Sequence, residues 1–355
     1  MTPPDQGRTP VNILLDCRWL GRGGAGRLTE LLLIELCKAP PRGVWQLWGE
    51  QSRLEKYRFP GALIAPWSGD PTKLFGQSDL LKVPAHDLAI YLHQLRPLRP
   101  GPSITFVLDT IPLRFGRRPW LQPAKRIFLW TTCRLSRKIV TISEVSRVSV
   151  VRDLHTKPSK VVVTTLGIDP DRVARVRALR ASSPRGDHVL FVGRFAEHKN
   201  LRRLVCAFQT TDFHRDGGRL ILVGGTPLQV AELSAFAADA NLTQLDIRPE
   251  CTEDELDHLI ATCRALVQPS LEEGYGLPAV EAAALGVQVA VSRTGYAPEI
   301  PPDLATFMDA YDVRSISVAV DQATRRPDSR LIWLPQSTVA ADLIGVIDAV
   351  IGVPS

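Results

Sequence analysis

Two glutamates around a pair of glycines are the residues of this sequence best suited to bind a polyhydroxylated ligand. Glu273 ends a loop, and Gly274 and Gly276 let the backbone approach a ligand closely. Pro278 suits the first turn of a helix, whose N-terminal N–H groups attract an anion. Glu281 follows within that helix, eight residues after Glu273. Carboxylates are poor phosphate ligands but accept hydrogen bonds from paired hydroxyls, so the pattern predicts a sugar or ribose beside an anion.

Two cations follow a second stretch, HVLFVG, which is typical of a buried strand. Arg194 comes directly after its last glycine, Lys199 comes five residues later, and Asn200 can cap the next helix. The carboxyl ends of parallel strands open into the crevice where such sheets bind ligands. A guanidinium fork with an ammonium group suits a diphosphate.

A third stretch, GRGGAGR at residues 21–27, has the G-x-G-x-x-G spacing of a dinucleotide loop and follows the strand-like run VNILLD. A dinucleotide fingerprint begins tightly at its strand end, whereas CRWL separates Asp16 from Gly21 here. A nicotinamide-dependent oxidoreductase therefore remains only as an alternative.

The elements that must position these residues alternate between short strands and longer helices, which favours an α/β fold with parallel sheets. Strands are expected at 11–16, 44–49, 88–92, 103–109, 138–143 and 160–166, and then at 188–193, 219–225, 245–249, 265–270 and 288–292. Helices are expected around 24–38, 121–137, 144–155, 200–209, 228–240, 253–262, 278–285 and 337–350.

A length of 355 residues suits two domains of ordinary size. The junction is expected near TLGIDPDR, so that the domains span 1–168 and 169–336. Asp169-Pro-Asp171 imitates the D-x-D metal motif of one class of sugar-transfer enzymes, but it lies in the linker rather than at a strand end facing a nucleotide. The histidines and cysteines also lack metal-ligand spacing, so no metal site is predicted.

Charge is distributed unevenly along the chain. Residues 1–170 contain 25 Lys and Arg against 13 Asp and Glu, whereas the remainder contains 18 against 24. Much of the excess lies at Arg114, Arg117, Arg118, Lys125, Arg126, Arg134, Arg137, Lys138, Arg147, Arg152, Lys157 and Lys160. The segment is either a solvated helical face or a surface for anionic lipid or a phosphate-bearing acceptor. No nucleic-acid partner is expected, because no basic-aromatic module accompanies the charge.

The cysteine pattern and the absence of a secretory signal or a membrane-length apolar run favour a cytoplasmic protein. The six cysteines are scattered without C-x-x-C pairs, as is typical of buried thiols in a reducing compartment.

The two chemistry-bearing stretches, GRFAEHKN and EEGYGLPAVEAAALG, resemble the signature of the retaining glycosyltransferases of family 4 (glycosyl transferases group 1). GGAGRLTELLLIEL resembles the N-terminal glycine loop and first helix of that family, and FVLDTIPLRF resembles a strand that usually ends in His-Asp. VTISEVSR, TLGID, APEI and Trp333 lie where the family has its later elements. The resemblance implies the GT-B fold, with two Rossmann-like domains facing each other across a cleft. The first would be the acceptor-side domain, with a C-terminal helix at about 337–355 packed on it, and the second would bind the nucleotide sugar.

The resemblance also implies a function. A hexose or deoxyhexose, mannose- or rhamnose-like, would pass from a nucleotide diphosphate sugar to a hydroxyl of a glycan or glycolipid with retention of configuration and without metal or cofactor. The implied catalytic residues are Arg194 and Lys199 on the diphosphate, Glu273 on the donor sugar, and Asp109. The implied donor-binding residues are Glu281 on the ribose, the backbone of Gly274, Tyr275, Gly276 and Leu277, and the loop glycines Gly24 and Gly26.

One position departs from the family pattern. Leu108 stands before Asp109 where many members have histidine, which removes a polar group from the reaction centre. An inactive scaffold that binds nucleotide sugar is therefore the main alternative to the enzyme. The basic first domain further suggests weak, salt-sensitive association with anionic membrane on the inner membrane face.

Overall fold

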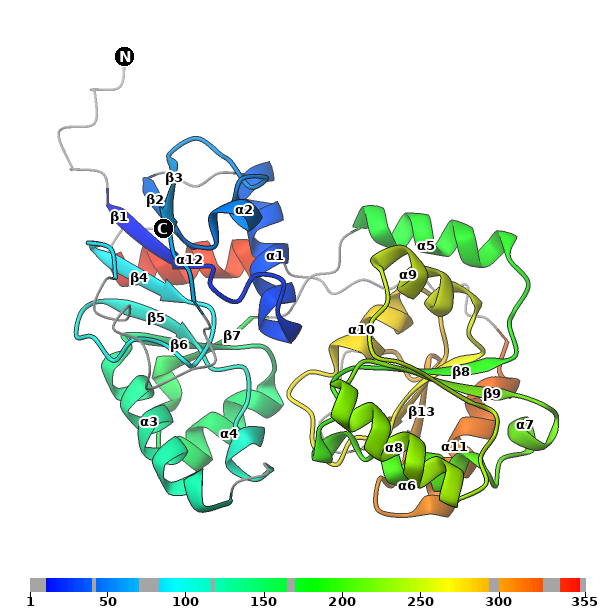
Figure 1. Ribbon diagram of the computed structural model, residues 1–355. Coiled ribbons are helices and arrows are strands. Elements are labelled where there is room, and N and C mark those ends of the chain that lie inside the picture. Colours follow the sequence, from blue (N-terminus) through cyan, green and yellow to red (C-terminus); the bar gives the residue numbers. More distant parts are fainter. Residues whose placement is uncertain are drawn as a thin grey trace. The chain divides into compact units, whose positions relative to one another are not determined.

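The computed structural model describes residues 11–39, 43–69, 83–115, 119–164, 170–293, 300–327 and 339–351. The chain separates into two compact units (Figure 1). The N-terminal unit comprises Met1–Thr110, Trp120–Leu166 and Ser337–Ser355, and the C-terminal unit comprises Ile111–Pro119 and Gly167–Gln336. Residues 111–119 thus group with the C-terminal unit, although the segments on either side of them in sequence belong to the N-terminal unit.

The N-terminal unit is built on a seven-stranded sheet in the order β3-β2-β1-β4-β5-β6-β7, in which every pairing is parallel. The strands are β1 (Asn12–Asp16), β2 (Val44–Gly49), β3 (Ala62–Pro66), β4 (Leu88–Tyr91), β5 (Ser103–Phe106), β6 (Lys138–Thr141) and β7 (Val161–Val163). Its α-helices are α1 (Gly23–Lys38), α2 (Gln51–Leu54), α3 (Gln122–Leu135), α4 (Glu144–Leu154) and α12 (Val339–Ile351). The C-terminal helix α12 contacts α1. Short 3-10 turns lie at Pro119–Leu121 and Pro158–Lys160.

The C-terminal unit is built on a six-stranded parallel sheet in the order β10-β9-β8-β11-β12-β13. The strands are β8 (His188–Val192), β9 (Arg219–Val223), β10 (Leu245–Arg248), β11 (Ala265–Gln268), β12 (Val289–Ser292) and β13 (Ala305–Met308). The α-helices are α5 (Pro170–Ser182), α6 (Leu201–Phe208), α7 (Asp212–Arg215), α8 (Pro227–Asp239), α9 (Glu253–Thr262), α10 (Leu277–Ala284) and α11 (Val313–Arg325). Further 3-10 turns lie at Ile111–Leu113 and Glu197–Lys199.

The inner strands of both sheets, such as β4 and β12, are fully buried, as is typical of parallel sheets, whereas the edge strands β3 and β10 are only partly buried. In the C-terminal unit, residues of β8, β9, β11 and α6 share one core with residues of α11, and α6 contacts α11 directly. The predicted α/β class with parallel sheets is confirmed. All six cysteines are free thiols, and three of them, Cys17, Cys133 and Cys263, are buried.

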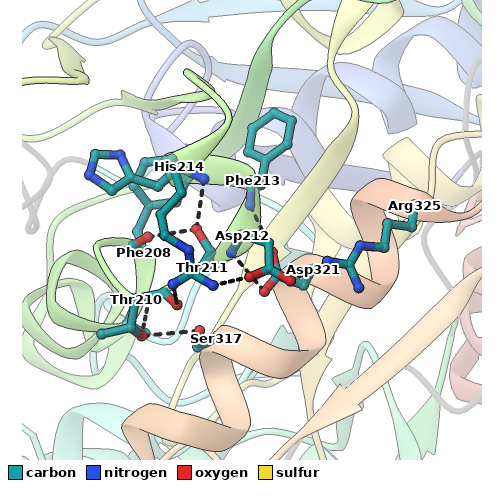
Figure 2. Close-up of polar contacts among 11 residues, drawn as sticks. Phe208, Thr210, Thr211, Asp212, Phe213, His214, Ser317, Asp321 and Arg325 are labelled. Atoms are coloured by element: carbon teal, nitrogen blue, oxygen red, sulfur yellow. Dashed lines mark hydrogen bonds and ion pairs between the residues drawn. The ribbon is translucent and has the colours of Figure 1, made fainter.

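A polar cluster fixes the short helix α7 to α11 (Figure 2). The Asp321 carboxylate accepts hydrogen bonds from the backbone N–H groups of Asp212 and Phe213, each at 3.0 Å. The Thr211 hydroxyl caps the same turn, and Arg325 donates to the Asp212 carboxylate. A carboxylate on N-terminal N–H groups satisfies donors that a helix leaves unpaired. This cluster is structural, because each of these contacts stabilises a helix end.

Candidate functional site

The C-terminal unit has its topological switch point between β8 and β11. The chain continues from β8 to β9 on one side, whereas β11, the neighbour of β8 on the other side, is followed by β12 farther out. Connections that diverge in this way leave a crevice at the carboxyl ends of the two strands, which is where open parallel sheets bind ligands. Arg194 follows β8 and Glu273 follows β11, so the fold brings the two sequence-predicted stretches to the same edge.

A largely buried ion pair forms the centre of this edge. The Lys199 ammonium donates to Glu273 Oε1, and the two side chains are only 13% and 10% exposed. The same oxygen accepts hydrogen bonds from Gln268 Nε2 at 2.6 Å and Ser270 Oγ at 2.7 Å. A buried pair needs such additional bonds to offset desolvation. The orientation of the Glu273 carboxylate is therefore fixed by three donors, two of which the sequence did not identify.

Asn200 does not cap helix α6 through its side chain, so that expectation is wrong. It occupies the N-cap position with a left-handed backbone, φ 61°, but its side chain makes no capping bond. Asn200 Nδ2 instead donates to the carbonyl oxygens of Pro269 at 3.0 Å and Ala310 at 2.6 Å. The side-chain amide of Asn200 therefore binds these two buried carbonyl oxygens and does not bind the first turn of α6. Its contact with Pro269 joins the loop after β8 to the end of β11.

His198 is a member of this site that the sequence reading did not single out. Burial lowers the pKa of its imidazole to about 4, and the positive charge of Lys199 acts in the same direction. The ring lies 5.7 Å from that of Phe115, and the His198 carbonyl accepts from the Leu271 N–H at 2.7 Å. His198 is therefore neutral at physiological pH. Its only sequence signal was its place beside Lys199.

The exposed Arg194 lies on a loop whose shape depends on glycines of two strands. Gly193 has φ 146°, and a Cβ on Gly224 would lie 2.2 Å from the Gly193 carbonyl oxygen. A Cβ on Gly225 would lie 2.6 Å from the Phe195 ring. The ends of β8 and β9 can approach this closely only without side chains at 224 and 225.

The stretch after Glu273 enters helix α10 through a glycine in the left-handed region. Gly276 is the N-cap with φ 75°, and no side chain among the described residues caps this helix. Gly274 is buried, Leu277 is half-buried, and the Tyr275 side chain is only 2% exposed. The Tyr275 ring is therefore a core group, and only its backbone suits ligand binding. An uncapped helix N-terminus here is compatible with an anion.

Glu281 lies in α10 and forms an ion pair with Arg172 of α5, with 3.2 Å between Oε1 and Nη1. Arg172 also donates through Nε to Asp257 Oδ1 at 2.8 Å. Although burial opposes the charge, these two carboxylates raise the pKa of the Arg172 guanidinium. The sequence predicted Glu281 but gave no indication of its partner, which lies 109 residues earlier.

The glycine loop of the N-terminal unit begins away from the end of its strand. β1 ends at Asp16, a turn follows, and α1 begins at Gly23. A Cβ on Gly26 would lie 2.6 Å from the Trp19 carbonyl oxygen, whereas one on Gly24 would meet nothing within 4 Å. Gly26 is therefore required by the packing of the loop on itself, and Gly24 is not.

Asp109 and Leu108 follow β5 in the N-terminal unit, and both are half-buried. Asp169, Trp333 and residues 297–299 of APEI lie outside the described residues, as do Arg117 and Arg118. Within the described part of the chain, no group of three or more His, Cys, Asp or Glu residues could hold a metal ion. No helix in that part is long and apolar enough to cross a bilayer.

Apolar side chains are exposed on α3, on α4 and in the 3-10 turn that precedes α3, and the two helices contact one another. Trp120 is 71% exposed, Ile127 65% and Val148 57%. The guanidinium of the exposed Arg134 stacks on Trp130, with its carbon 5.1 Å from the ring centroid. The basic segment is therefore interleaved with exposed aromatic and aliphatic groups. We refer to the exposed side chains of Trp120, Ile127, Trp130, Arg134 and Val148 as the α3/α4 face.

Comparisons with known proteins relate the C-terminal unit to a known family. Residues 179–335 match the family Glycosyl transferases group 1, and this stretch contains Arg194, Lys199, Glu273 and Glu281. This part of the chain is therefore a glycosyl transferases group 1 domain.

Two curated relatives are O-antigen chain mannosyltransferases. The chain is 28% identical over 193 residues to O-antigen chain mannosyltransferase B of Escherichia coli, a match that covers 52% of this chain and 51% of the relative. It is 23% identical over 251 residues to O-antigen chain mannosyltransferase RfbU of Salmonella typhimurium, covering 70% and 68%. The first match spans only about half of each protein.

Among solved structures, HepE of Anabaena in complex with UDP and glucose superimposes with a TM-score of 0.64 at 16% identity. The likeness covers 89% of this chain and 90% of that chain. It confirms the predicted fold of two Rossmann-like domains.

Proposed function

We propose that this protein is a retaining glycosyltransferase of family 4 that transfers a hexose, with mannose favoured, from a nucleotide diphosphate sugar to a hydroxyl of a glycan or glycolipid. The observation that carries the proposal is the Glu273 carboxylate, held by Lys199, Gln268 and Ser270 at the switch point of a glycosyl transferases group 1 domain. A fixed, largely buried carboxylate beside two cations suits a sugar hydroxyl next to a diphosphate.

The chemistry follows from where charge develops. Arg194 and Lys199 bind the donor diphosphate and stabilise the negative charge that grows on it as the glycosidic bond breaks. The backbone of residues 274–277 and the dipole of α10 act on the same phosphate oxygens. These positive groups take the place of a metal ion, so we propose metal independence.

Sugar recognition uses the two carboxylates. Glu273 accepts hydrogen bonds from donor-sugar hydroxyls, and Glu281 accepts from the ribose diol. The leaving phosphate takes the proton of the acceptor hydroxyl on the same face of the sugar, which retains the anomeric configuration. Asp109 and the backbone of the loop with Gly24 and Gly26 are the further catalytic and donor-binding groups of this proposal. The names of the two relatives support mannose, and the HepE complex adds UDP to the nucleotides to be tested.

The test begins with binding and continues to transfer. UDP, GDP and their glucose and mannose conjugates are added to the full chain, and the melting temperature is recorded. A donor at a hundred times its dissociation constant adds about 2.7 kcal/mol of stability. The stabilising donor is then incubated with lipid-linked and soluble glycan acceptors with excess chelator, and product anomers are assigned by NMR.

The possible outcomes separate the enzyme from its main alternative. Transfer with retention supports the proposal. Donor binding without transfer or nucleoside diphosphate release identifies the inactive scaffold that Leu108 suggests. Binding of a nicotinamide dinucleotide in place of all sugar nucleotides would revive the oxidoreductase. Full dependence on manganese or magnesium would overturn metal independence.

We further propose that the acceptor is met at an anionic membrane surface, on the α3/α4 face. Trp side chains partition to the bilayer interface, and Lys and Arg gain about 1 kcal/mol each near anionic lipid. The apolar groups on this face are exposed and are interleaved with cations, which fits lipid headgroups better than plain solvent. Location would then be peripheral, on the cytoplasmic side of the membrane.

Vesicle co-sedimentation tests the membrane proposal. Anionic vesicles at low salt should bind the protein, neutral vesicles should bind less, and near-physiological salt should weaken binding. The double variant Trp120→Ser/Ile127→Ser should lose most of the binding to anionic vesicles at low salt. Leu228→Ser is the matched control, because Leu228 is 59% exposed on α8 of the other unit. Equal binding to both lipids, or none at low salt, would leave the face solvated and favour a soluble acceptor.

A further inference from the structure

Four charged side chains form a cluster between α5, α9 and α10 in the C-terminal unit. Arg172 is 9% exposed and Asp257 is 4% exposed. Arg172 lies between two carboxylates, with Nε donating to Asp257 at 2.8 Å and Nη1 lying 3.2 Å from Glu281. Arg175, one turn later on α5, donates to the other Asp257 oxygen at 3.0 Å. Arg175 has a side chain that is 60% exposed.

The cluster is asymmetric in a way that concerns Glu281. Both arginines bind Asp257, but the ion pair with Glu281 is made by Arg172. Asp257 fixes the Arg172 guanidinium from one side, and its Nη1 then fixes one Glu281 oxygen. A planar guanidinium has its donors in a rigid fork, so anchoring at Nε also sets the direction of Nη1. Arg172 can thus transmit a fixed orientation to the carboxylate of α10.

We infer that Arg172 is a positioning residue for the nucleotide ribose, because it orients the Glu281 carboxylate toward the 2′,3′-diol. This inference rests on the proposed function, in which Glu281 binds the ribose. A carboxylate has about four acceptor sites, which is more than one guanidinium nitrogen can fill. Arg172 itself does not contact the nucleotide. Its effect is on specificity for a ribonucleotide.

A merely structural role predicts something different. If Arg172 only neutralised buried carboxylates, its loss would weaken binding of every nucleotide by the same factor. If it orients Glu281, its loss removes the part of the affinity that depends on the diol. A hydrogen bond to a charged group contributes about 1.5–3 kcal/mol, which corresponds to a factor of about 10–150 in affinity. The ratio of the dissociation constants of the 2′-deoxy and ribo forms measures the part of the affinity that depends on the diol.

The experiment compares dissociation constants of UDP with 2′-deoxy-UDP and of GDP with 2′-deoxy-GDP, by calorimetry on the full chain. The wild type should prefer the ribo form of whichever nucleotide binds by about tenfold or more. Glu281→Gln and Arg172→Met should both bring the ratio close to one, and the double variant should bring it no lower. Arg172→Lys keeps a cation without the fork and should give an intermediate ratio. Arg175→Met is the matched control and should keep the wild-type ratio.

Each outcome has a distinct meaning. If Arg172→Met weakens both forms equally and keeps the ratio, Arg172 is only structural and the inference is wrong. If Glu281→Gln keeps the ratio, the ribose role of Glu281 fails and the inference fails with it. If no nucleoside diphosphate binds the wild type, the proposed function itself fails. Arg172→Lys gives the decisive ratio should Arg172→Met not fold.

Discussion

The two units share a sheet topology but use their switch points differently. In the N-terminal unit the chain diverges between β1 and β4, and in the C-terminal unit between β8 and β11. The end of β1 has a bidentate pair, Asp16 with Arg18, whose side chains are 0% and 1% exposed. The Arg18 guanidinium also lies over Trp48, 4.2 Å from the ring centroid.

The C-terminal switch point instead presents polar groups that are fixed without being fully enclosed. Lys199 and Glu273 retain slight exposure, and Arg194 is exposed on its loop. The same topology thus supplies such an edge in each unit, and the loops decide whether the charged groups there are fully enclosed or remain partly exposed. Substitutions at the two edges should therefore separate stability from activity.

The largest expected effect is loss of stability in Asp16→Asn. This change leaves the buried Arg18 guanidinium without its carboxylate, which costs about 3–5 kcal/mol. Denaturant unfolding of the full chain measures it. Asp187→Asn is the control, since its pair with Arg219 is exposed at the surface and should change stability little. Similar losses in both variants would contradict the contrast between the edges.

At the other edge, Lys199→Met should abolish most transfer, and it should destabilise the protein less than Asp16→Asn does, because Gln268 and Ser270 still donate to the Glu273 carboxylate. Loss of one group that stabilises developing charge costs about a hundredfold or more in rate. Glu273→Gln keeps the shape of the carboxylate and should also lose turnover, because the amide no longer balances the Lys199 charge. Steady-state kinetics with the donor found by thermal shift give the numbers, and circular dichroism checks folding. Wild-type turnover in both variants would remove this edge from the active site.

The sequence located the polar residues of the C-terminal edge because each lies next to a recognisable strand. Arg194 follows HVLFV directly, and Glu273 follows ALVQ by a short loop. It could not supply their partners, since contacts such as Asn200 to Ala310 join residues 110 positions apart. The sequence analysis also missed the edge strands β3 and β13, although it predicted the other two edge strands, β7 and β10.

Helix α5 was missed for a physical reason as well. Its sequence PDRVARVRALRAS is rich in arginine and has no broad apolar face. Its stability comes from tertiary contacts instead. Arg180, for example, donates to the carbonyl oxygens of Ala261 and Cys263 at 2.8 and 3.1 Å, at the end of α9. Such contacts override local pattern, and they also place Arg172 beside Glu281.

The largely buried imidazole of His198 should make the stability of the protein depend on pH. The folded pKa of His198 is about 4 against an ordinary value of 6.5, so the unfolded chain binds the proton more readily. Stability from this group is full above pH 6.5 and is lost as pH falls toward 4, by at most about 3 kcal/mol. Unfolding free energies of wild type and His198→Leu should therefore converge or cross within this window.

Two variants check the cause. Lys199→Met removes a cation that lowers the His198 pKa, so it should make the pH dependence shallower. Glu273→Gln removes a carboxylate that opposes the shift, so it should make the dependence steeper. His258→Asn, on the exposed face of α9, is the control and should leave the profile as in the wild type. Equal profiles in the wild type and His198→Leu would contradict a neutral His198, and equal profiles in the wild type, Lys199→Met and Glu273→Gln would leave burial as the cause of the shift.

The smallest expected effect returns to the glycine loop after β1, where Gly24→Ala and Gly26→Ala should act in opposite directions. At Gly24 a Cβ meets nothing within 4 Å, and alanine restricts the unfolded chain and favours helix α1, which should add about 0.4–1 kcal/mol of stability. At Gly26 a Cβ would lie 2.6 Å from the Trp19 carbonyl oxygen, so alanine should destabilise. Thermal unfolding should therefore rank the melting temperatures with Gly24→Ala highest, the wild type next and Gly26→Ala lowest.

Transfer assays then separate packing from binding, because a Gly24→Ala protein that is more stable yet slower has lost a close backbone approach to the donor. Unchanged transfer in the stabilised Gly24→Ala protein would leave this loop a structural turn and confine donor binding to the edge of β8 and β11.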